Sequence, residues 1–431
     1  MKSRLKNKIV IVIAIILTIF YFTNDFALID IEKTAIIVAL GIDKVDSGIE
    51  LTAQIGVPQA SQQTFNNEDT LISAKGETVM EAVENISKRS GWFPKLSFCN
   101  VIILGKDLAN DNVQIVCDHL LASEHFQSSA LLAVCDGTAR DFLSTPTPLD
   151  NISSFAIRKV IVENGAATSR VGDSNVKSFC QDMHGKKNCG YMPFITIISG
   201  EAKEEGQTGK AVNSGENFAD FSEKSGDNGL IAPLFENCDT FSRDRFLSST
   251  EGQSGGESSP SAIFDATKTA VFKDGKIVDI LSEDETVYLN LLNKKAQRLV
   301  LTTKIDDKSC ALEVYKNKHN LSLDFGVKPT LNLDLKLTVR VADSTTESAN
   351  NNFLGRRSKV PDEYLLSLEN DATTVIKSLA TRMLEKGVDL FGIKDRLYKY
   401  HYFKYEDYKN IPLDQYLINL NVQVLTLDSP K

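Results

Sequence analysis

The most constraining feature of this 431-residue chain is a strict alternation between residues 331 and 341. Odd positions are aliphatic and even positions are polar: Leu331, Leu333, Leu335, Leu337, Val339 and Val341 against Asn332, Asp334, Lys336, Thr338 and Arg340. Because successive side chains of a strand point to opposite faces, the pattern predicts a long strand with one buried and one solvated face. The chain must therefore build a sheet here and cover one side of it.

The flanking sequence supplies more of this sheet and its cover. A helix is expected from Tyr364 to Lys386, because an apolar stripe recurs at helical spacing and Gly387 can end it. The stripe consists of Leu368, Ala372, Val375, Ile376, Leu379 and Met383. A shorter helix is expected over 389–398, and strands over 299–305, 310–316, 320–326 and 418–424. Residues 263–431 therefore read as an antiparallel sheet backed by a long helix.

Two local signals open this C-terminal region. Asp274-Gly275 stands between the apolar runs 269–272 and 277–280, which is typical of a tight hairpin. Ser282 and Glu285 have the spacing of a capping box, so a helix should follow them to about Lys294.

The first half alternates strands with helices. Strands are expected over 34–42, 49–57, 98–104, 130–135 and 194–198, and helices over 78–89, 113–122, 152–163 and 174–183. Residues 30–199 thus read as an α/β domain. Residues 200–262 are rich in Gly, Ser and acidic residues and are expected to be a flexible linker or insertion. The fold class expected is α+β, with two or three subdomains whose mixed or antiparallel sheets pack against helices.

The first 29 residues form a signal or anchor segment. Lys2, Arg4, Lys6 and Lys8 precede an apolar run from Ile9 to Phe22. Basic residues stay on the cytoplasmic side, so the remainder should be exported. We favour an uncleaved membrane anchor; a cleaved signal peptide and a buried element of a cytosolic protein are the alternatives. The net charge of −9 argues against nucleic acid as a partner.

No constellation of catalytic residues is evident. No phosphate-loop motif occurs in the sequence, and Cys180-x3-His184-x4-Cys189 is its only cluster that resembles metal ligands. It lacks a fourth ligand nearby, and Cys180 and Cys189 could instead form a disulfide. Cys99, Cys117 and Cys135 read as core residues. We therefore predict no catalytic, cofactor-binding or metal residue, no cofactor and no enzyme activity.

Two aromatic stretches are candidate contact surfaces. Gly91-Trp92-Phe93-Pro94 holds the only tryptophan, and we interpret it as a buried turn rather than an exposed contact. Tyr398-Lys-Tyr-His-Tyr-Phe-Lys-Tyr405 interleaves aromatic and cationic residues. Such residues are enriched at binding surfaces, so this stretch predicts either a partner or membrane contact or ordinary edge packing.

Four stretches carry a resemblance to a known family. They are residues 31–58 with Gly41-Ile-Asp-Lys44, residues 96–142 with Val101-Ile-Ile-Leu-Gly-Lys106, the hairpin and capped helix of 269–286, and Gly387-Val-Asp-Leu-Phe-Gly392 with the final strand. In this order the chain resembles the GerC (Ger(x)C) family, the C-subunits of bacterial spore germinant receptors. The resemblance covers roughly residues 30–198 and 262–427.

The resemblance implies a function. Family members are lipoproteins on the outer face of the spore's inner membrane, act beside integral A and B subunits in nutrient sensing, and have no enzyme site. This chain departs from the pattern because no Cys precedes Cys99, so the usual lipobox thioether is impossible and anchoring would depend on Ile9–Phe22.

We accordingly expect a non-enzymatic, membrane-tethered receptor subunit that faces outward from the spore inner membrane and binds A- and B-type subunits. The alternative is an extracytoplasmic module that binds the small-molecule germinant directly.

Overall fold

The computed structural model describes residues 11–18, 34–56, 70–123, 126–147, 150, 152–172, 174–199, 262–293, 299–305, 308–344 and 360–427. Residues 1–199 and 261–431 make one compact unit. Apart from Ala262, the predicted linker lies outside the described residues, so it stays a prediction.

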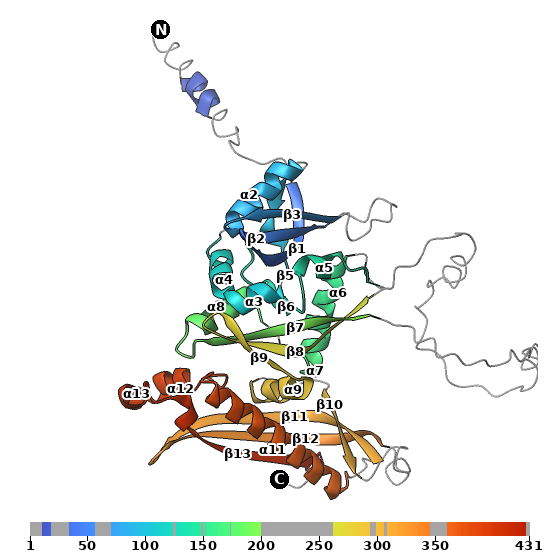
Figure 1. Ribbon diagram of the computed structural model, residues 1–431, viewed down its shortest axis with the longest axis vertical. Helices are drawn as coiled ribbons and strands as arrows, with labels where there is room; N and C mark the ends of the chain where they lie inside the picture. Colours follow the sequence, from blue (N-terminus) through green and yellow to red (C-terminus); the bar gives the residue numbers. More distant parts are fainter. Residues whose placement is uncertain are drawn as a thin grey trace, which may run out of the picture. The chain divides into compact units, whose positions relative to one another are not determined.

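Nine of the described strands form a first, mixed sheet (Figure 1). In spatial order they are β3 (Leu71–Gly76), β2 (Gly48–Ile55), β1 (Thr34–Val45), β5 (Val101–Leu104), β6 (Leu131–Cys135), β7 (Cys189–Ser199), β8 (Ala262–Lys273) and β9 (Lys276–Leu281), with β4 (Phe93–Lys95) beside β1. The central pairs β1–β5, β5–β6 and β6–β7 are parallel, and the outer pairs are antiparallel.

The centre of this sheet is buried on both faces. In β5, Ile102 and Leu104 enter one core, whereas Val101 and Ile103 enter another. The first core is covered by α2 (Val79–Ser90), α3 (Lys106–Asp111), α4 (Val113–Ala122) and α8 (Val176–His184). The second is covered by α5 (Ala139–Ser144), α6 (Ser153–Lys159) and the π-helical turn η4 (Val160–Asn164), followed by α7 (Gly165–Thr168). Continuous apolar runs such as 101–104 are what such a doubly covered strand requires.

The predicted hairpin and capping box are both confirmed. Asp274 and Gly275 have φ values of 52° and 79° in the turn between β8 and β9. The Ser282 amide donates to Glu285 Oε2 at 3.0 Å, and the Glu285 amide donates to Ser282 Oγ at 3.3 Å. These two hydrogen bonds lie at the start of α9 (Glu283–Asn293).

A second sheet of four described strands has the order β10 (Leu299–Ile305), β11 (Lys308–Phe325), β12 (Pro329–Ser344) and β13 (Leu417–Thr426). In β12 the odd residues from Leu331 to Val339 are buried, as the alternation predicts. The buried face packs against α9 and α11 (Asp362–Glu385), which lies across the sheet in Figure 1. The remaining elements are η3 (Leu96–Phe98), α12 (Ile393–Tyr400), α13 (Tyr402–Tyr408) and η6 (Leu413–Gln415).

Three predictions about elements require correction. The expected strands 310–316 and 320–326 are one strand, β11, because the polar residues between them lie within it and Asn317 is buried with its amide on the Leu291 carbonyl. The last strand runs parallel to β12, so this sheet is mixed rather than antiparallel. The helix expected at Asp389 begins at Ile393 because Asp389 caps it from outside.

The predicted domain boundaries stay a prediction. The first sheet takes β8 and β9 from the region assigned to the C-terminal domain. At the N-terminus, residues 11–18 are helical, and the rest of the expected anchor lies outside the described residues. None of the helices in the described ranges combines the length and the apolar character needed to cross a membrane.

Candidate interaction site

The aromatic stretch predicted as a contact surface folds into a helical corner. α12 and α13 meet at His401, whose backbone (φ −132°, ψ 44°) breaks the helix. We call Tyr398, Tyr400, Tyr402, Phe403 and Tyr405 the aromatic corner. Phe403 is 98% exposed, Tyr400 74% and Tyr402 64%, and α13 has no buried residue. Its outer side is therefore an apolar surface without a covering layer in the part of the chain described.

The inner side of the same corner is packed. The rings of His401 and Tyr408 lie edge-on to Phe325 at the end of β11, with centroids 4.9 and 4.8 Å away. Tyr398 lies edge-on to Tyr405 at 5.2 Å. Edge packing therefore describes the inner side of this element, whereas its outer side is exposed and a partner or membrane contact there stays a prediction.

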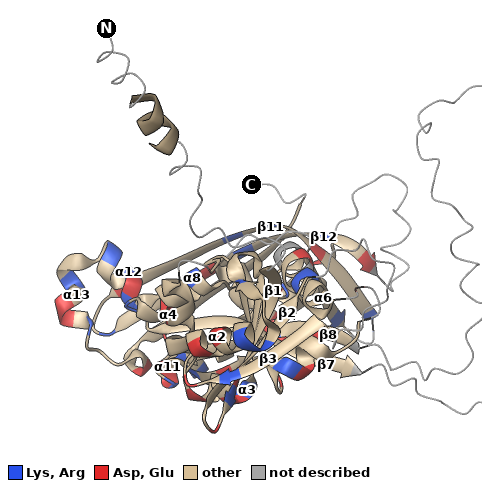
Figure 2. Cartoon of the chain, turned by 90° about the horizontal axis from the view of Figure 1, so that it is seen from above, with Lys and Arg blue, Asp and Glu red and all other residues tan. Residues whose placement is uncertain are grey.

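Lysines lie over two rings of the corner and over the neighbouring Phe325. Lys186 Nζ lies 5.4 Å from the Tyr398 ring centroid and 6.0 Å from that of Tyr405, and Lys404 Nζ lies 4.6 Å from Phe325. Cation–π contacts of this kind are worth about 0.5–1 kcal/mol at exposed sites. Figure 2 shows basic and acidic residues side by side on α12 and α13, so the corner carries no single-sign charge.

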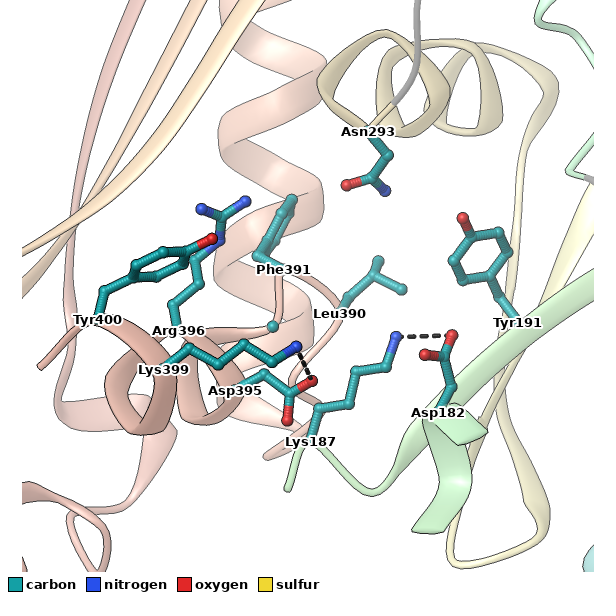
Figure 3. A pocket seen from close by; sticks show the side chains of 11 residues that line it. Asp182, Lys187, Tyr191, Asn293, Leu390, Phe391, Asp395, Arg396, Lys399 and Tyr400 are labelled. Carbon is teal, nitrogen blue, oxygen red and sulfur yellow. Dashed lines mark ion pairs between the residues drawn. The ribbon is translucent and has the colours of Figure 1, made fainter. Parts of the chain in front are cut away.

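A cavity of about 380 Å³ borders the corner. Tyr400, Lys399 and Arg396 of α12 line one side, and residues of α8, β7 and the end of α9 line the other (Figure 3). Two ion pairs lie in it, Asp182 with Lys187 at 2.7 Å and Asp395 with Lys399 at 3.7 Å, and Arg396 donates to the Leu321 carbonyl at 3.0 Å. It is a polar pocket built by two distant parts of the chain.

Leu390 and Phe391 line the pocket, and both are buried, as is Asp389, which directly precedes them. The Asp389 carboxylate accepts hydrogen bonds from the backbone amides of Ile393 (2.6 Å) and Lys394 (2.8 Å), which fixes the start of α12. Burial raises its pKa, and these two amides partly offset the rise. The Cys189 thiol donates to the Asp389 carbonyl at 2.9 Å.

The groups near the pocket are poor nucleophiles. Burial raises the pKa of Cys189 to about 12 and that of Tyr191 to about 12. A thiol with such a pKa is protonated near neutral pH and inert. The arrangement can bind polar groups and position a helix, but it does not assemble a nucleophile with a base.

The Cys180, His184 and Cys189 cluster is separated in the structure. Cys180 is buried in the first core, and Cys189 faces Asp389. His184 Nε2 lies 2.7 Å from Asp118 Oδ1. Among the residues described, no three potential ligands group around a metal position. Cys180 and Cys189 are both free thiols, which excludes the disulfide considered from the sequence.

The interpretation of Trp92 as part of a buried turn is wrong. Trp92 is 49% exposed and Phe93 54% exposed, because they follow the last turn of α2 onto the short edge strand β4. Gly91 ends α2 with φ 70°.

The resemblance motif Gly41-Ile-Asp-Lys44 has a structural role that sequence reasoning missed. Asp43 is buried, and its carboxylate accepts from the amides of Ala139 (2.7 Å) and Arg140 (3.1 Å) at the start of α5. An Asp directly after the continuous apolar run of β1 was the available signal. Lys44 forms a surface ion pair with Asp111 at 2.9 Å.

Comparison with known proteins identifies both halves of the chain. Residues 28–197 match the spore germination protein N-terminal domain, and residues 267–426 match the spore germination B3/GerAC-like C-terminal domain. The chain is 28% identical over 190 residues to YfkR of Bacillus subtilis (strain 168), covering 42% of this chain and 47% of that protein. It is 32% identical over 124 residues to spore germination protein B3 of the same organism, covering 28% and 33%. The alignments thus span less than half of either relative.

The crystal structure of the GerBC protein aligns with 90% of this chain and 97% of its own, at 15% identity and a TM-score of 0.46. Family membership rests on the two domain models, which follow one another and together match more than half of the sequence. The chain belongs to the GerC family of spore germination proteins.

Proposed function

We propose that this chain is a non-enzymatic subunit of a spore germinant receptor, tethered to the outer face of the spore inner membrane and assembled with A- and B-type membrane subunits. The observation that carries the assembly is the aromatic corner. Exposed Tyr and Phe side chains held by packed neighbours are typical of the anchors of protein interfaces. Family membership supports a role in spore germination, and the basic and apolar N-terminal segment supports the membrane tether.

The corner suits a protein partner because it is pre-organised. Tyr398 packs edge-on against Tyr402 and Tyr405, and Lys186 lies over Tyr398 and Tyr405, so these rings lose little side-chain freedom when a partner covers them. Its mixed charges favour a polar rim around an aromatic centre, which is the common anatomy of an interface.

The test is affinity purification of the full chain from spore membranes in mild detergent. We expect A- and B-type subunits to copurify with the wild type. The double variant Tyr402→Ala/Phe403→Ala should recover them about ten-fold less, since one lost anchor costs roughly this factor. Tyr315→Ala, which removes a 61% exposed ring from β11, is the matched control and should copurify like the wild type.

Two outcomes would contradict the proposal. Recovery of neither subunit with the wild type removes the assembly. Unchanged recovery with the double variant leaves the assembly but removes the aromatic corner from its interface. Deletion of the gene should also slow germination with at least one nutrient in a strain without paralogues.

A second candidate function is direct binding of the germinant in the polar pocket. Its volume of about 380 Å³ is in the range of small-molecule sites, roughly 300–1,000 Å³. Lys187, Arg396, Asp182 and Asp395 offer both signs of charge to a zwitterion. Calorimetry of the full chain in detergent with amino acids, sugars and bile salts tests it. Heat that disappears in Lys187→Ala would support binding here, and no heat with any of them would exclude it.

A further inference from the structure

A second exposed aromatic surface lies on the first sheet, far along the chain from the aromatic corner. It consists of Ile36, Trp92, Phe93, Lys95 and Phe98, which we call the Trp92 surface. Trp92, Phe93 and Phe98 are 49%, 54% and 49% exposed. Three half-exposed aromatic rings within seven residues need an explanation, because large apolar patches on a soluble surface usually mark a contact site.

The backbone brings Ile36, Phe93 and Lys95 together, and Trp92 directly precedes Phe93. β4 pairs in parallel with the first residues of β1, with Thr34 opposite Phe93 and Ile36 opposite Lys95. Alternate residues of a strand share a face, so Ile36, Phe93 and Lys95 share one. Lys95 Nζ lies 5.8 Å from the Phe98 ring centroid. The Trp92 amide donates to Ser90 Oγ at 3.2 Å, which holds the indole's backbone at the surface.

The local charge differs from that of the whole chain. From Asn85 to Gly105 the sequence contains Lys88, Arg89 and Lys95 and no Asp or Glu, although the chain carries a net charge of −9. Lys88 is paired with Glu84 at 2.9 Å, which leaves Arg89 and Lys95 as the cations of this stretch without an ion pair to the described residues. An anionic surface repels most of this protein, but not this stretch. Rings of Trp and Phe next to Lys and Arg are the composition of segments that lie at a membrane interface.

The position along the chain points to the same partner. Eleven residues separate Phe22, the end of the apolar N-terminal run, from Thr34, the first residue of β1. Extended chain covers at most about 3.6 Å per residue, so Thr34 lies within about 40 Å of a membrane that holds that run. Thr34 is also the residue paired with Phe93. The Trp92 surface therefore lies where the described fold begins, next to the proposed tether.

From this juxtaposition we infer that the Trp92 surface contacts an anionic lipid bilayer. Trp92, Phe93 and Phe98 enter the interfacial region, and Arg89 and Lys95 meet anionic headgroups. A second, folded contact beside a single apolar anchor fixes the orientation of the domain and leaves the aromatic corner for protein partners. The inference rests on the proposed membrane tether.

Trp92 is itself the probe, because it is the only tryptophan of the chain. The full-length protein is reconstituted into vesicles of phosphatidylcholine and phosphatidylglycerol, with or without bromine on the phosphatidylcholine acyl chains, and the indole is excited selectively. Bromine quenches only indoles that enter the lipid. We expect about a two-fold loss of Trp92 emission in brominated vesicles and a blue-shifted maximum. Phe93→Ser/Phe98→Ser should remove most of this quenching, whereas Tyr402→Ser/Phe403→Ser should leave it unchanged.

Flotation of the same vesicles after alkaline carbonate treatment reports on the tether separately. Retention with quenching supports both proposals. Retention with equal Trp92 emission in the two vesicle types overturns the lipid contact and leaves the tether intact. Release by carbonate overturns the tether, and the lipid contact with it. Circular dichroism establishes that the variants are folded, and the wild-type measurement decides the inference even if a variant fails to fold.

Discussion

At the scale of single residues, two buried carboxylates have the same structural role in different halves of the chain. Asp43 and Asp389 each reach two backbone amides at the start of a short helix, α5 and α12. Four N-terminal amides of a helix lack intrahelical acceptors, so each carboxylate satisfies two groups that would otherwise be buried without a partner. Both belong to stretches that carry the family resemblance, which gives those stretches a structural meaning.

Removal of the Asp389 carboxylate should destabilise the fold. Asp389→Ala leaves the amides of Ile393 and Lys394 without acceptors in a buried site, at a cost of about 1–3 kcal/mol. Denaturant unfolding followed by circular dichroism measures it. Asp407→Ala, which removes an exposed carboxylate from α13, should change the free energy of unfolding by less than about 0.5 kcal/mol. Equal effects of the two variants would contradict the capping role.

The pH dependence of stability should carry a signature of Asp43. Burial raises its pKa above 3.8, although the amides of Ala139 and Arg140 lower it in part. Between 3.8 and the raised value the folded chain holds a proton that the unfolded chain has lost, so the free energy of unfolding falls as the pH rises through this window. Asp43→Asn lacks this contribution. The stability difference between the wild type and this variant should therefore shift against the wild type over this window, and a shift the other way would contradict the raised pKa.

At the scale of elements, the β8–β9 hairpin links a turn to a neighbouring helix. Gly275 has a φ of 79°, and a Cβ placed there would overlap Oδ1 of Asn112. Asn112 caps α4 through the Gln114 amide, and the Val113 amide donates to the Gly275 carbonyl. The β8–β9 turn and the cap of α4 are therefore coupled through direct contacts.

Gly275→Ala should accordingly lower the free energy of unfolding by more than the replacement of a turn glycine usually does. Strain at positive φ contributes about 1 kcal/mol, and displacement of the Asn112 cap about 1 kcal/mol more. Thermal unfolding of the variant measures the total. Gly326→Ala, in the turn between β11 and β12, is the control, because a Cβ there meets nothing within 4 Å. If both variants unfold alike, the coupling between turn and cap is absent.

The same elements indicate what could be predicted from the sequence. The strand 331–341, the hairpin and the capping box depend on local patterns, and each was predicted correctly. The parallel placement of β13 depends on the route that the chain takes through α11, α12 and α13, which no local pattern encodes. The sequence predicts two strands in place of β11 because the polar residues 316–320 look like a turn unless the burial of Asn317 is known.

The candidate site was predictable only in part. The stretch 398–405 was singled out because its composition suits a contact. The pocket beside it joins Asp182 and Lys187 to residues about two hundred positions later, and sequence spacing cannot show this. The exposure of Trp92 depends on where α2 ends against β4. The sequence does not show this arrangement, so it could not distinguish a buried turn from an exposed contact.

At the scale of the whole molecule, α9 joins the two sheets. Every residue from Thr286 to Leu292 is buried, which a helix shows only when it is covered on all sides. Thr286 Oγ1 donates to Thr269 Oγ1 of β8, and Asn317 of β11 donates to the Leu291 carbonyl. Arg382 of α11 adds ion pairs to Asp279 and Glu285 at 2.8 Å each. The two sheets therefore share a core and should unfold as one.

Leu291→Ala tests this coupling from a distance. Leu291 is fully buried in the core that contains the second sheet, and its truncation should cost about 2–5 kcal/mol. Trp92 reports on the first sheet alone. If the sheets unfold together, the denaturation midpoint followed by Trp92 fluorescence falls by the same amount as the midpoint followed by circular dichroism. Leu366→Ala, at a 59% exposed position of α11, should move neither. A Trp92 midpoint that stays in place while circular dichroism shifts would mean that α9 belongs energetically to the second sheet only.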